Sequence, residues 1–191
     1  FIISQDLMKT ITYRSSSKIV AIVKRKKYDI NKIKFSDDEL ILVLDKPEKP
    51  GNIGAILRTY NALGFKNIII SDTKTEIYNP NIIRSSLGAI FYLNVFQLDT
   101  KKTITFLKEN NFNIYGSLIK SKTLVNDIDF RNKCAVLMGT ESSQINDIFL
   151  KNSDSTFKIP MIGDVDSLNL SVSTAIILYQ AMIQKKSINF M

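Results

Sequence analysis

Hydrophobic and polar positions follow two alternating patterns along the chain. Short runs of consecutive apolar residues, rich in β-branched side chains, predict buried strands over 40–44, 67–71, 91–98, 112–118, 133–138 and 156–159. Between them apolar residues recur every three or four positions, which predicts helices over 51–63, 79–87, 103–110 and 142–151. Strands that alternate with helices are typical of a parallel sheet covered by helices on both faces. We therefore expect an α/β fold.

The last predicted strand leads into a strand-loop-helix junction. Ile159 precedes Pro160, which disfavours helical backbone at Ile159 and ends the strand there. Ser167 and Asn169 are residue types that cap helices. From Leu168 onward, apolar residues at helical spacing predict a long helix with one buried stripe: Leu168, Val172, Ala175, Ile176, Tyr179, Met182 and Ile183. This junction predicts a cradle for a small ligand.

Residues 1–36 differ in character from the rest of the chain. An apolar run at 18–23 predicts one more strand, and the basic residues 24–27 follow it. These charges fit either a solvated connector or a patch that contacts phosphates, and the sequence leaves both readings open. An acidic turn at 36–39 marks the boundary with the main domain, 37–191.

Composition excludes several classes of site. The chain has no histidine, which rules out Ser-His-Asp triads, Cys-His pairs and most zinc sites, and we expect no metal. The single cysteine, Cys134, lies in an apolar run, which favours core packing and a reducing compartment, the cytoplasm or alternatively an organellar matrix. No apolar run approaches the roughly 18 residues of a membrane span, so we expect no membrane association. The net charge of +8 favours an anionic partner, nucleic acid first.

Three loops should lie at one edge of the sheet, since ligands of such sheets bind beyond the carboxyl ends of the strands. They are 47–54, 139–144 and 162–169. None of them contains the Gly-x-Gly-x-x-Gly turn of dinucleotide sites, and the chain has no Walker A motif. We therefore expect neither a dinucleotide-binding site of the Rossmann type nor a P-loop.

The helix after the first loop carries a candidate functional arginine. Arg58 points away from the apolar stripe that includes Ile53 and Leu57. Gly54 lies one turn earlier on the face of Arg58, where the lack of a side chain would leave the guanidinium open to a ligand. The alternative is an ordinary solvated arginine and a loop glycine.

Three segments together carry a resemblance to a known family. The segment 52–59 (Asn-x-Gly-x-x-x-Arg-Thr), the turn 137–141 (Leu-Met-Gly-Thr-Glu) and the segment 159–172 resemble the three signature motifs of the SpoU (TrmH-type) RNA ribose 2′-O-methyltransferases. They occur in the family's order and spacing. The resemblance covers the chain from about Leu40 to its C-terminal end.

The resemblance implies a fold, a cofactor and an assembly. The fold is the parallel-sheet SPOUT fold, in which the C-terminal segment threads a loop as a trefoil knot, an exception to the usual absence of knots. The implied cofactor is S-adenosylmethionine, held in the knot largely by main-chain groups. The implied assembly is a homodimer whose active site is completed across the interface. By motif position, the residues assigned to the cofactor are Leu137, Gly139, Ile159, Met161 and Leu168.

The implied reaction is methylation of a ribose 2′-hydroxyl in structured RNA, which requires the hydroxyl to be oriented and relieved of its proton. The family position of Arg58 is often assigned as the base. Because a guanidinium stays protonated in proteins, we instead expect Arg58 to grip the target phosphate or 2′-oxygen and to stabilise developing negative charge. Asn52 would orient the nucleotide, and Glu141 keeps the carboxylate of the second motif. Ser167 and Asn169 would position Arg58 or the cofactor, with plain helix capping as the alternative.

The second motif departs from the family pattern Gly-x-Glu-Gly-x-Gly, because Ser142 and Gln144 replace two glycines. If these positions require positive φ, both residues are costly there. A second function therefore stays open, that of an RNA-binding protein on a SPOUT scaffold that no longer methylates. A third is a small-molecule enzyme that binds a phosphorylated ligand at the start of the helix 51–63.

The resemblance extends to residues 1–36, which are similar to the linker that follows an N-terminal RNA-binding domain in many ribosomal-RNA members. We interpret 1–36 as that linker, or as the remnant of such a domain, and 37–191 as the SPOUT methyltransferase domain. The chain begins at Phe1, and we expect it to be the catalytic part of a longer protein. This favours ribosomal RNA over tRNA as the substrate.

Overall fold

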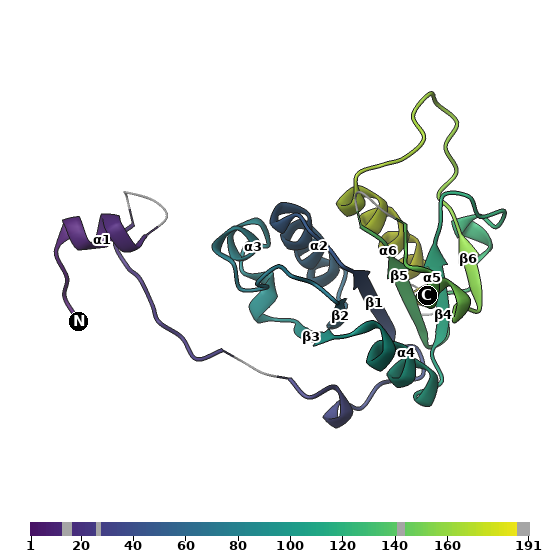
Figure 1. Ribbon diagram of the computed structural model, residues 1–191, viewed down its shortest axis with the longest axis horizontal. Coiled ribbons are helices and arrows are strands. Elements are labelled where there is room, and N and C mark those ends of the chain that lie inside the picture. Colours follow the sequence, from purple (N-terminus) through teal and green to yellow (C-terminus); the bar gives the residue numbers. More distant parts are fainter. Residues whose placement is uncertain (13–16, 26–27, 141–143, 187–191) are drawn as a thin grey trace.

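The computed structural model describes residues 1–12, 17–25, 28–140 and 144–186. Within these residues the centre of the molecule is a sheet of six strands, all parallel, in the order β3-β2-β1-β5-β4-β6 (Figure 1). The strands are β1 (Leu40–Asp45), β2 (Asn67–Ser71), β3 (Asn94–Leu98), β4 (Asn113–Ser117), β5 (Cys134–Met138) and β6 (Ser155–Phe157). The expected α/β fold with a parallel sheet is confirmed.

The helices occupy the connections between these strands. They are α1 (Gln5–Ile11), α2 (Pro50–Ala62), α3 (Pro80–Ser85), α4 (Thr100–Glu109), α5 (Asp147–Lys151) and α6 (Leu170–Lys186), with short 3-10 helices η1 (Ile30–Lys32), η2 (Ala89–Phe91) and η3 (Val125–Asp127). The main difference from the sequence expectation is α5, which begins only at Asp147 because Asn146 is its N-terminal cap. No described helix is long and apolar enough to cross a membrane.

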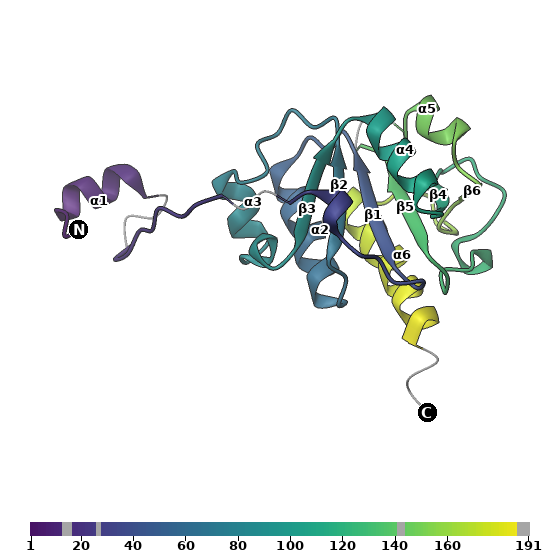
Figure 2. The ribbon, with the colours of Figure 1, turned by 90° about the horizontal axis from the view of Figure 1, so that it is seen from below.

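Side chains of the central strand β1 alternate between two cores, one on each face of the sheet. Leu42 and Leu44 belong to the core that α2, α3 and α6 cover, whereas Ile41 and Val43 belong to the core beneath α4 and α5 (Figures 1 and 2). Residues 28–35 add to the second core. The packing therefore extends to the amino-terminal side of the boundary expected at 36–39, and the division into domains stays a prediction.

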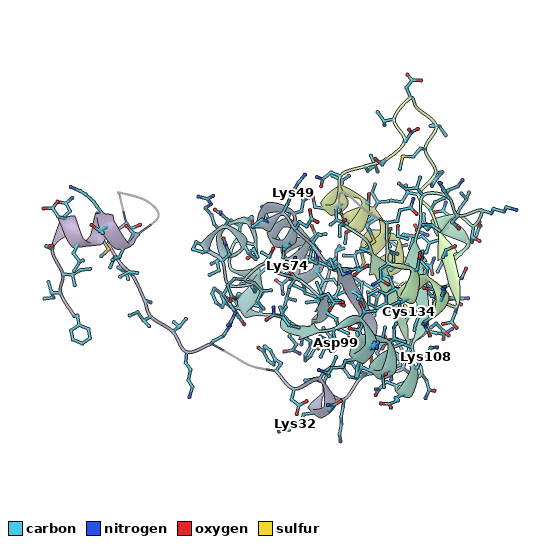
Figure 3. The ribbon with its side chains drawn as sticks, viewed as in Figure 1. Lys32, Lys49, Lys74, Asp99, Lys108 and Cys134 are labelled. Atoms are coloured by element: carbon cyan, nitrogen blue, oxygen red, sulfur yellow. The ribbon has the colours of Figure 1, made fainter. Side chains whose placement is uncertain are left out.

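Cys134 is buried in β5 and lies within the body of the domain (Figure 3), which confirms the expectation of core packing. Burial raises the pKa of its thiol to about 12. The thiolate is the reactive form of cysteine, so at neutral pH this side chain is a small apolar filler and not a nucleophile.

The prediction of a strand at 18–23 is wrong. The described residues 17–25 contain no regular element, and this arm extends away from the sheet (Figure 1). Ile19, Ile22 and Val23 are exposed. A strand is stable only when another strand satisfies its backbone groups, and an apolar run in the sequence does not supply that partner.

The face by which α6 packs also differs from the expectation. The helix is present, but its buried residues are Leu170, Thr174, Ile177, Leu178 and Ala181. In the stripe expected to be buried, Val172, Ile176, Tyr179 and Ile183 are exposed. Both sides of α6 carry apolar residues, so periodicity alone could not select the side that faces the sheet. The trefoil knot stays a prediction.

Gly54 has a packing role that the sequence analysis did not foresee. It is buried on α2, where a β-carbon would lie 1.9 Å from Ser85 Oγ and 2.8 Å from the Ile82 carbonyl oxygen. Gly54 therefore lets α3 approach α2 closely, and it does not open a path to Arg58. The interpretation of Gly54 as ligand access was wrong, because α3 fills the space beside it.

Gly54→Ala should lower the free energy of unfolding by about 1–3 kcal/mol, the usual cost of overpacking against neighbours that cannot yield. The matched control is Gly51→Ala on the same helix, where a β-carbon would meet nothing within 4 Å. That control should be neutral or stabilising by about 0.5–1 kcal/mol, because alanine favours helix more than glycine does. Urea unfolding of both variants measures the difference, and equal effects would contradict the packing role of Gly54.

Candidate functional site

The carboxyl ends of the strands border a cavity of about 780 Å³. Its walls come from the ends of β4 and β5, from the loops that follow β4, β5 and β6, and from the first turns of α6. Because all six strands are parallel, these loops emerge at one edge of the sheet. The cavity therefore lies where the sequence analysis expected ligand chemistry.

The loop after β6 forms one wall with both of its ends. Ile159 and Met161 line the cavity from the outgoing end, and Ser167 and Leu168 line it from the returning end. The tip of the loop projects away from the body of the molecule (Figures 1 and 3), and Ile162 is fully exposed. The expected strand-loop-helix cradle is thus present as geometry.

The loop after β5 forms a second wall. Gly139, Thr140, Gln144 and Ile145 line the cavity, and Ile145 is also buried in the core beneath α4 and α5. The expected catalytic residue Glu141 and the substituted Ser142 lie outside the described residues. The described part of this loop therefore places the second motif beside the third.

Of the five residues assigned to a cofactor, four line the cavity and one does not. Gly139, Ile159, Met161 and Leu168 are in its wall. Leu137 is fully buried within β5, and its side chain packs in the core beneath α4 and α5. Leu137 therefore contributes to the support of the site, and its side chain does not reach the cavity.

Asn52 and Asn169 meet although they are far apart in the sequence. The Asn169 side-chain amide Nδ2 donates a hydrogen bond to Asn52 Oδ1 at 3.3 Å. Asn169 Oδ1 also accepts hydrogen bonds from the Ser171 backbone N–H at 2.9 Å and from Ser171 Oγ at 2.7 Å. Asn169 therefore both caps the start of α6, the alternative considered above, and contacts Asn52 of the first motif.

Arg58 is exposed on α2 and is not among the residues that line the cavity. Its neighbours Ile53, Ile56 and Leu57 are fully buried, which confirms that Arg58 points away from the apolar stripe. The α2 helix contacts α6, whose first residues border the cavity. The structure of a single chain thus separates Arg58 from the cavity wall, while Asn52 and Asn169 join the two helices.

A third wall, not expected from the sequence, is formed by Ser117, Leu118 and Ile119 at the end of β4. The expectations also omitted Lys158 and Asp166, the charged side chains in the lining. The available signal was the predicted strand 112–118, because the carboxyl end of any parallel strand belongs to the ligand-binding edge. Only the strand order shows that β4 lies between β5 and β6 and so reaches the cavity.

A metal centre has no support among the described residues, which contain no group of three or more His, Cys, Asp or Glu side chains able to hold an ion. The lining instead combines apolar side chains, hydroxyl groups and loop backbone. Such a lining suits an organic ligand with an apolar body that main-chain groups orient.

The sequence from residue 39 to residue 179 matches the model of the SpoU rRNA Methylase family. The chain belongs to the SpoU rRNA Methylase family. The match contains all three motif segments, from Asn52 to the start of α6, and the structure brings the second and third of them together around the cavity.

Two characterised proteins illustrate how similar this SpoU chain is to its relatives. It is 30% identical over 175 residues to a 23S rRNA (uridine(2479)-2′-O)-methyltransferase of Streptomyces viridochromogenes, covering 88% of this chain and 61% of that protein. It is 24% identical over 179 residues to the 23S rRNA (guanosine(2553)-2′-O)-methyltransferase RlmP of Bacillus subtilis, covering 94% of this chain and 71% of the relative. The chain thus spans less than two thirds of the Streptomyces protein.

Solved structures of RNA methyltransferases share the fold. The SpoU methyltransferase AviRb from Streptomyces viridochromogenes, in complex with the cofactor AdoMet, superimposes with a TM-score of 0.79 at 29% identity, covering 83% of this chain and 65% of that one. An AdoMet-bound rRNA methyltransferase from Sinorhizobium meliloti gives a TM-score of 0.89 at 24% identity, covering 98% of this chain and 71% of that one. The second likeness bears on the fold alone.

Proposed function

We propose that this SpoU chain catalyses S-adenosylmethionine-dependent methylation of a ribose 2′-hydroxyl in structured RNA, with ribosomal RNA favoured over tRNA. The observation that carries the proposal is the cavity, in which Gly139 of the second motif faces Ile159 and Leu168 of the third. Family membership and the names of the relatives, two of which are 23S rRNA 2′-O-methyltransferases, support the reaction and the substrate class.

The cavity fits the proposed cofactor. About 780 Å³ lies within the range of small-molecule sites, roughly 300–1,000 Å³. Ile159, Met161 and Leu168 offer apolar surface, and the glycine at position 139 leaves its backbone accessible. When bound, S-adenosylmethionine supplies an electrophilic methyl group on a sulfonium. Gly139, Ile159, Met161 and Leu168 would hold it, with Leu137 supporting the wall from within β5.

The chain's own residues would act on the RNA. Arg58, exposed on α2, would bind the target phosphate or the 2′-oxygen and stabilise negative charge as it develops. Asn52 would orient the nucleotide, and its hydrogen bond with Asn169 would hold that amide in place. Ser167 borders the cavity and would position the reacting groups. Glu141, the carboxylate of the second motif, is proposed as a further catalytic residue.

Loss of activity through the altered second motif is the competing proposal, that of an RNA-binding protein that does not methylate. Gln144 stands at one of the two substituted glycine positions and lines the cavity, so the substitution lies in the wall of the proposed cofactor site. The affinity for S-adenosylmethionine therefore decides between the enzyme and the inactive scaffold.

Calorimetry with S-adenosylmethionine should give saturable heat with wild-type protein. Incubation with the cofactor and deproteinised ribosomal RNA should then leave one alkali-resistant linkage, because a 2′-O-methyl group blocks the 2′-hydroxyl that alkaline cleavage requires. Binding of RNA without any heat from S-adenosylmethionine would favour the inactive scaffold. Methyl groups on bases would contradict the assignment to ribose.

Arg58→Ala should lower the rate of methylation by about 10²–10³-fold, the usual effect of removing a group that stabilises developing charge. Because Arg58 does not line the cavity, the affinity for S-adenosylmethionine should stay at the wild-type value. The control is Arg131→Ala, which removes an exposed arginine that pairs with Asp129 near the amino end of β5. Wild-type turnover in Arg58→Ala would remove Arg58 from the mechanism.

The exposed face of α6 supports the proposal that the chain forms a homodimer. Val172, Ile176 and Tyr179 are 46%, 39% and 57% exposed, and their spacing of four and three places them on one side of the helix. An apolar stripe of this kind is suited to packing against the same stripe of a second copy, since symmetric dimers pair one patch with itself. The resemblance to the family implies that the active site is completed across such an interface.

Ile176→Glu should convert the dimer to a monomer, because it would bury a charge without a partner at the interface. Light scattering coupled to size-exclusion chromatography measures the mass. The matched control is Ile148→Glu, which places the same charge at an isoleucine that is 48% exposed on α5, on the opposite face of the sheet from α6. A monomeric wild type, or a dimeric Ile176→Glu, would refute the role of α6.

Residues 1–36 are proposed as a linker or remnant of an RNA-binding domain ahead of the methyltransferase domain 37–191. The described arm carries exposed Lys18, Lys24 and Arg25, which suits contact with phosphates. Arg25 also lies over the ring of Tyr78, 4.7 Å from its centroid, and pairs with Glu76, so the end of the arm is tied to the catalytic domain. The proposed location is the cytoplasm, with an organellar matrix as the alternative.

A further inference from the structure

A buried carboxyl group lies at the end of the central strand β1, on the face of the sheet opposite α2 and α6. Asp45 is the last residue of the strand and is only 2% exposed. Its Oδ2 accepts a hydrogen bond from the Asn146 backbone N–H at 2.9 Å. Its Oδ1 is buried and has no hydrogen-bond partner among the described residues. Burying a carboxyl group costs free energy unless hydrogen bonds compensate for the lost water. The hydrogen bond from Asn146 is therefore the contact that stabilises Asp45 in this position.

That contact is made at the end of the loop that forms the second cavity wall. Asn146 follows Gln144 and Ile145, which line the cavity, and it begins α5 as the N-terminal cap. Its Oδ1 accepts hydrogen bonds from the backbone N–H groups of Ile148 at 2.8 Å and Phe149 at 3.2 Å. Asn146 thus joins the loop, the helix and Asp45 through separate atoms.

The Asn146 side chain extends the network to the start of α4 and to the residue that follows β2. Its Nδ2 donates to Thr100 Oγ1 at 3.1 Å, and Thr100 Oγ1 in turn donates to Asp72 Oδ2 at 2.6 Å. The Thr100 backbone N–H also donates to Asp72 Oδ2, at 3.1 Å. Asp45, the last residue of β1, pairs in register with Ser71, the last residue of β2. Asp72 follows Ser71, so Asp45 and Asp72 lie at the same edge of the sheet. The end of the loop is therefore held by Asp45 of β1 and by Thr100 at the start of α4.

We propose that Asp45 is a positioning residue for the methyl-donor site, whose buried carboxyl group fixes Asn146 and so holds the adjoining Gln144 and Ile145 in the wall of the cavity. This inference rests on the function proposed above. Asp45 does not line the cavity and would act only through the loop.

The environment of Asp45 agrees with a dedicated role. Burial raises the pKa of Asp45, while the hydrogen bond from Asn146 and the charge of Lys46 oppose that rise. An asparagine at position 45 could accept the same hydrogen bond without the cost of burying a charge. Acceptance of the Asn146 N–H, and not the charge itself, is therefore the property that the site requires.

Asp45→Ala should weaken binding of S-adenosylmethionine about tenfold, because the Asn146 N–H loses its acceptor and the loop loses one of its two anchors. RNA affinity should not change, and the KM for the cofactor should rise more than kcat falls. Asp45→Asn should restore the cofactor affinity to within about threefold of wild type, since it keeps an acceptor oxygen. Calorimetry and initial rates measure these values at a temperature at which the variants are folded.

The matched control is Asp154→Ala. Asp154 also accepts a backbone hydrogen bond, from the Ile114 N–H at 2.7 Å, but it does so at the amino end of β4, away from the cavity. This control should lose stability and keep the cofactor affinity of wild type. Wild-type affinity in folded Asp45→Ala would overturn the proposal, and so would an equal loss of affinity in Asp154→Ala.

A second variant decides the matter if Asp45→Ala does not fold. Asp45→Leu removes both carboxyl oxygens, so the Asn146 N–H loses its acceptor, while an apolar side chain of similar shape fills the buried position. It should weaken cofactor binding by at least about twofold, and unchanged binding would overturn the proposal. If wild-type protein itself gives no heat with S-adenosylmethionine, the proposed methyltransferase function is wrong. If wild-type protein binds the cofactor and the Asp45 variants bind it equally well, only the positioning role of Asp45 is wrong.

Discussion

The parallel pairing of β1 with β5 at the centre of the sheet is the constraint on which the rest of the structure depends. Leu42 of β1 lies opposite Ile68 of β2 on one side and Val136 of β5 on the other. Because the strands run in the same direction, the loops after β4, β5 and β6 emerge together and enclose the cavity. A shift of this register by one residue would move the side chains of one strand to the opposite core, where they would not fit the packing, and would displace the loops relative to one another.

The helices α2, α3 and α6, which cover one face of the sheet, contribute both to core packing and to the candidate site. Gly54 lets α3 approach α2, and α2 in turn packs against α6. The first turn of α6 borders the cavity, and its opposite side leaves Ile176 and Tyr179 exposed. One helix therefore closes the core, forms part of the cavity wall and presents a surface suited to a second copy. Asp45 provides the corresponding support from the other face of the sheet.

Local patterns of apolar residues predicted the central elements well, because strands buried on both faces of the sheet need continuous apolar runs. The central strands and α2 lie close to their expected bounds, because continuous apolar runs and a helical stripe each fit one structure. The prediction failed at 18–23, where an apolar run has no neighbouring strand, and at the stripe of α6, which is exposed. The motifs located Gly139, Ile159, Met161, Ser167 and Leu168 in the cavity wall, but Lys158 and the end of β4 carried no motif signal.

The sequence by itself determined the class of fold, the order of elements and the family, since these depend on the spacing of apolar residues and on motif residues that are local in the chain. Only the tertiary structure decided which side of α6 packs, why position 54 is glycine, and that the buried carboxyl of Asp45 holds Asn146 at the end of a loop 101 residues away. These properties depend on distances between segments remote in the chain. Such distances are set when the sheet assembles, because burial and hydrogen bonding are satisfied between strands and helices together and not within any one of them.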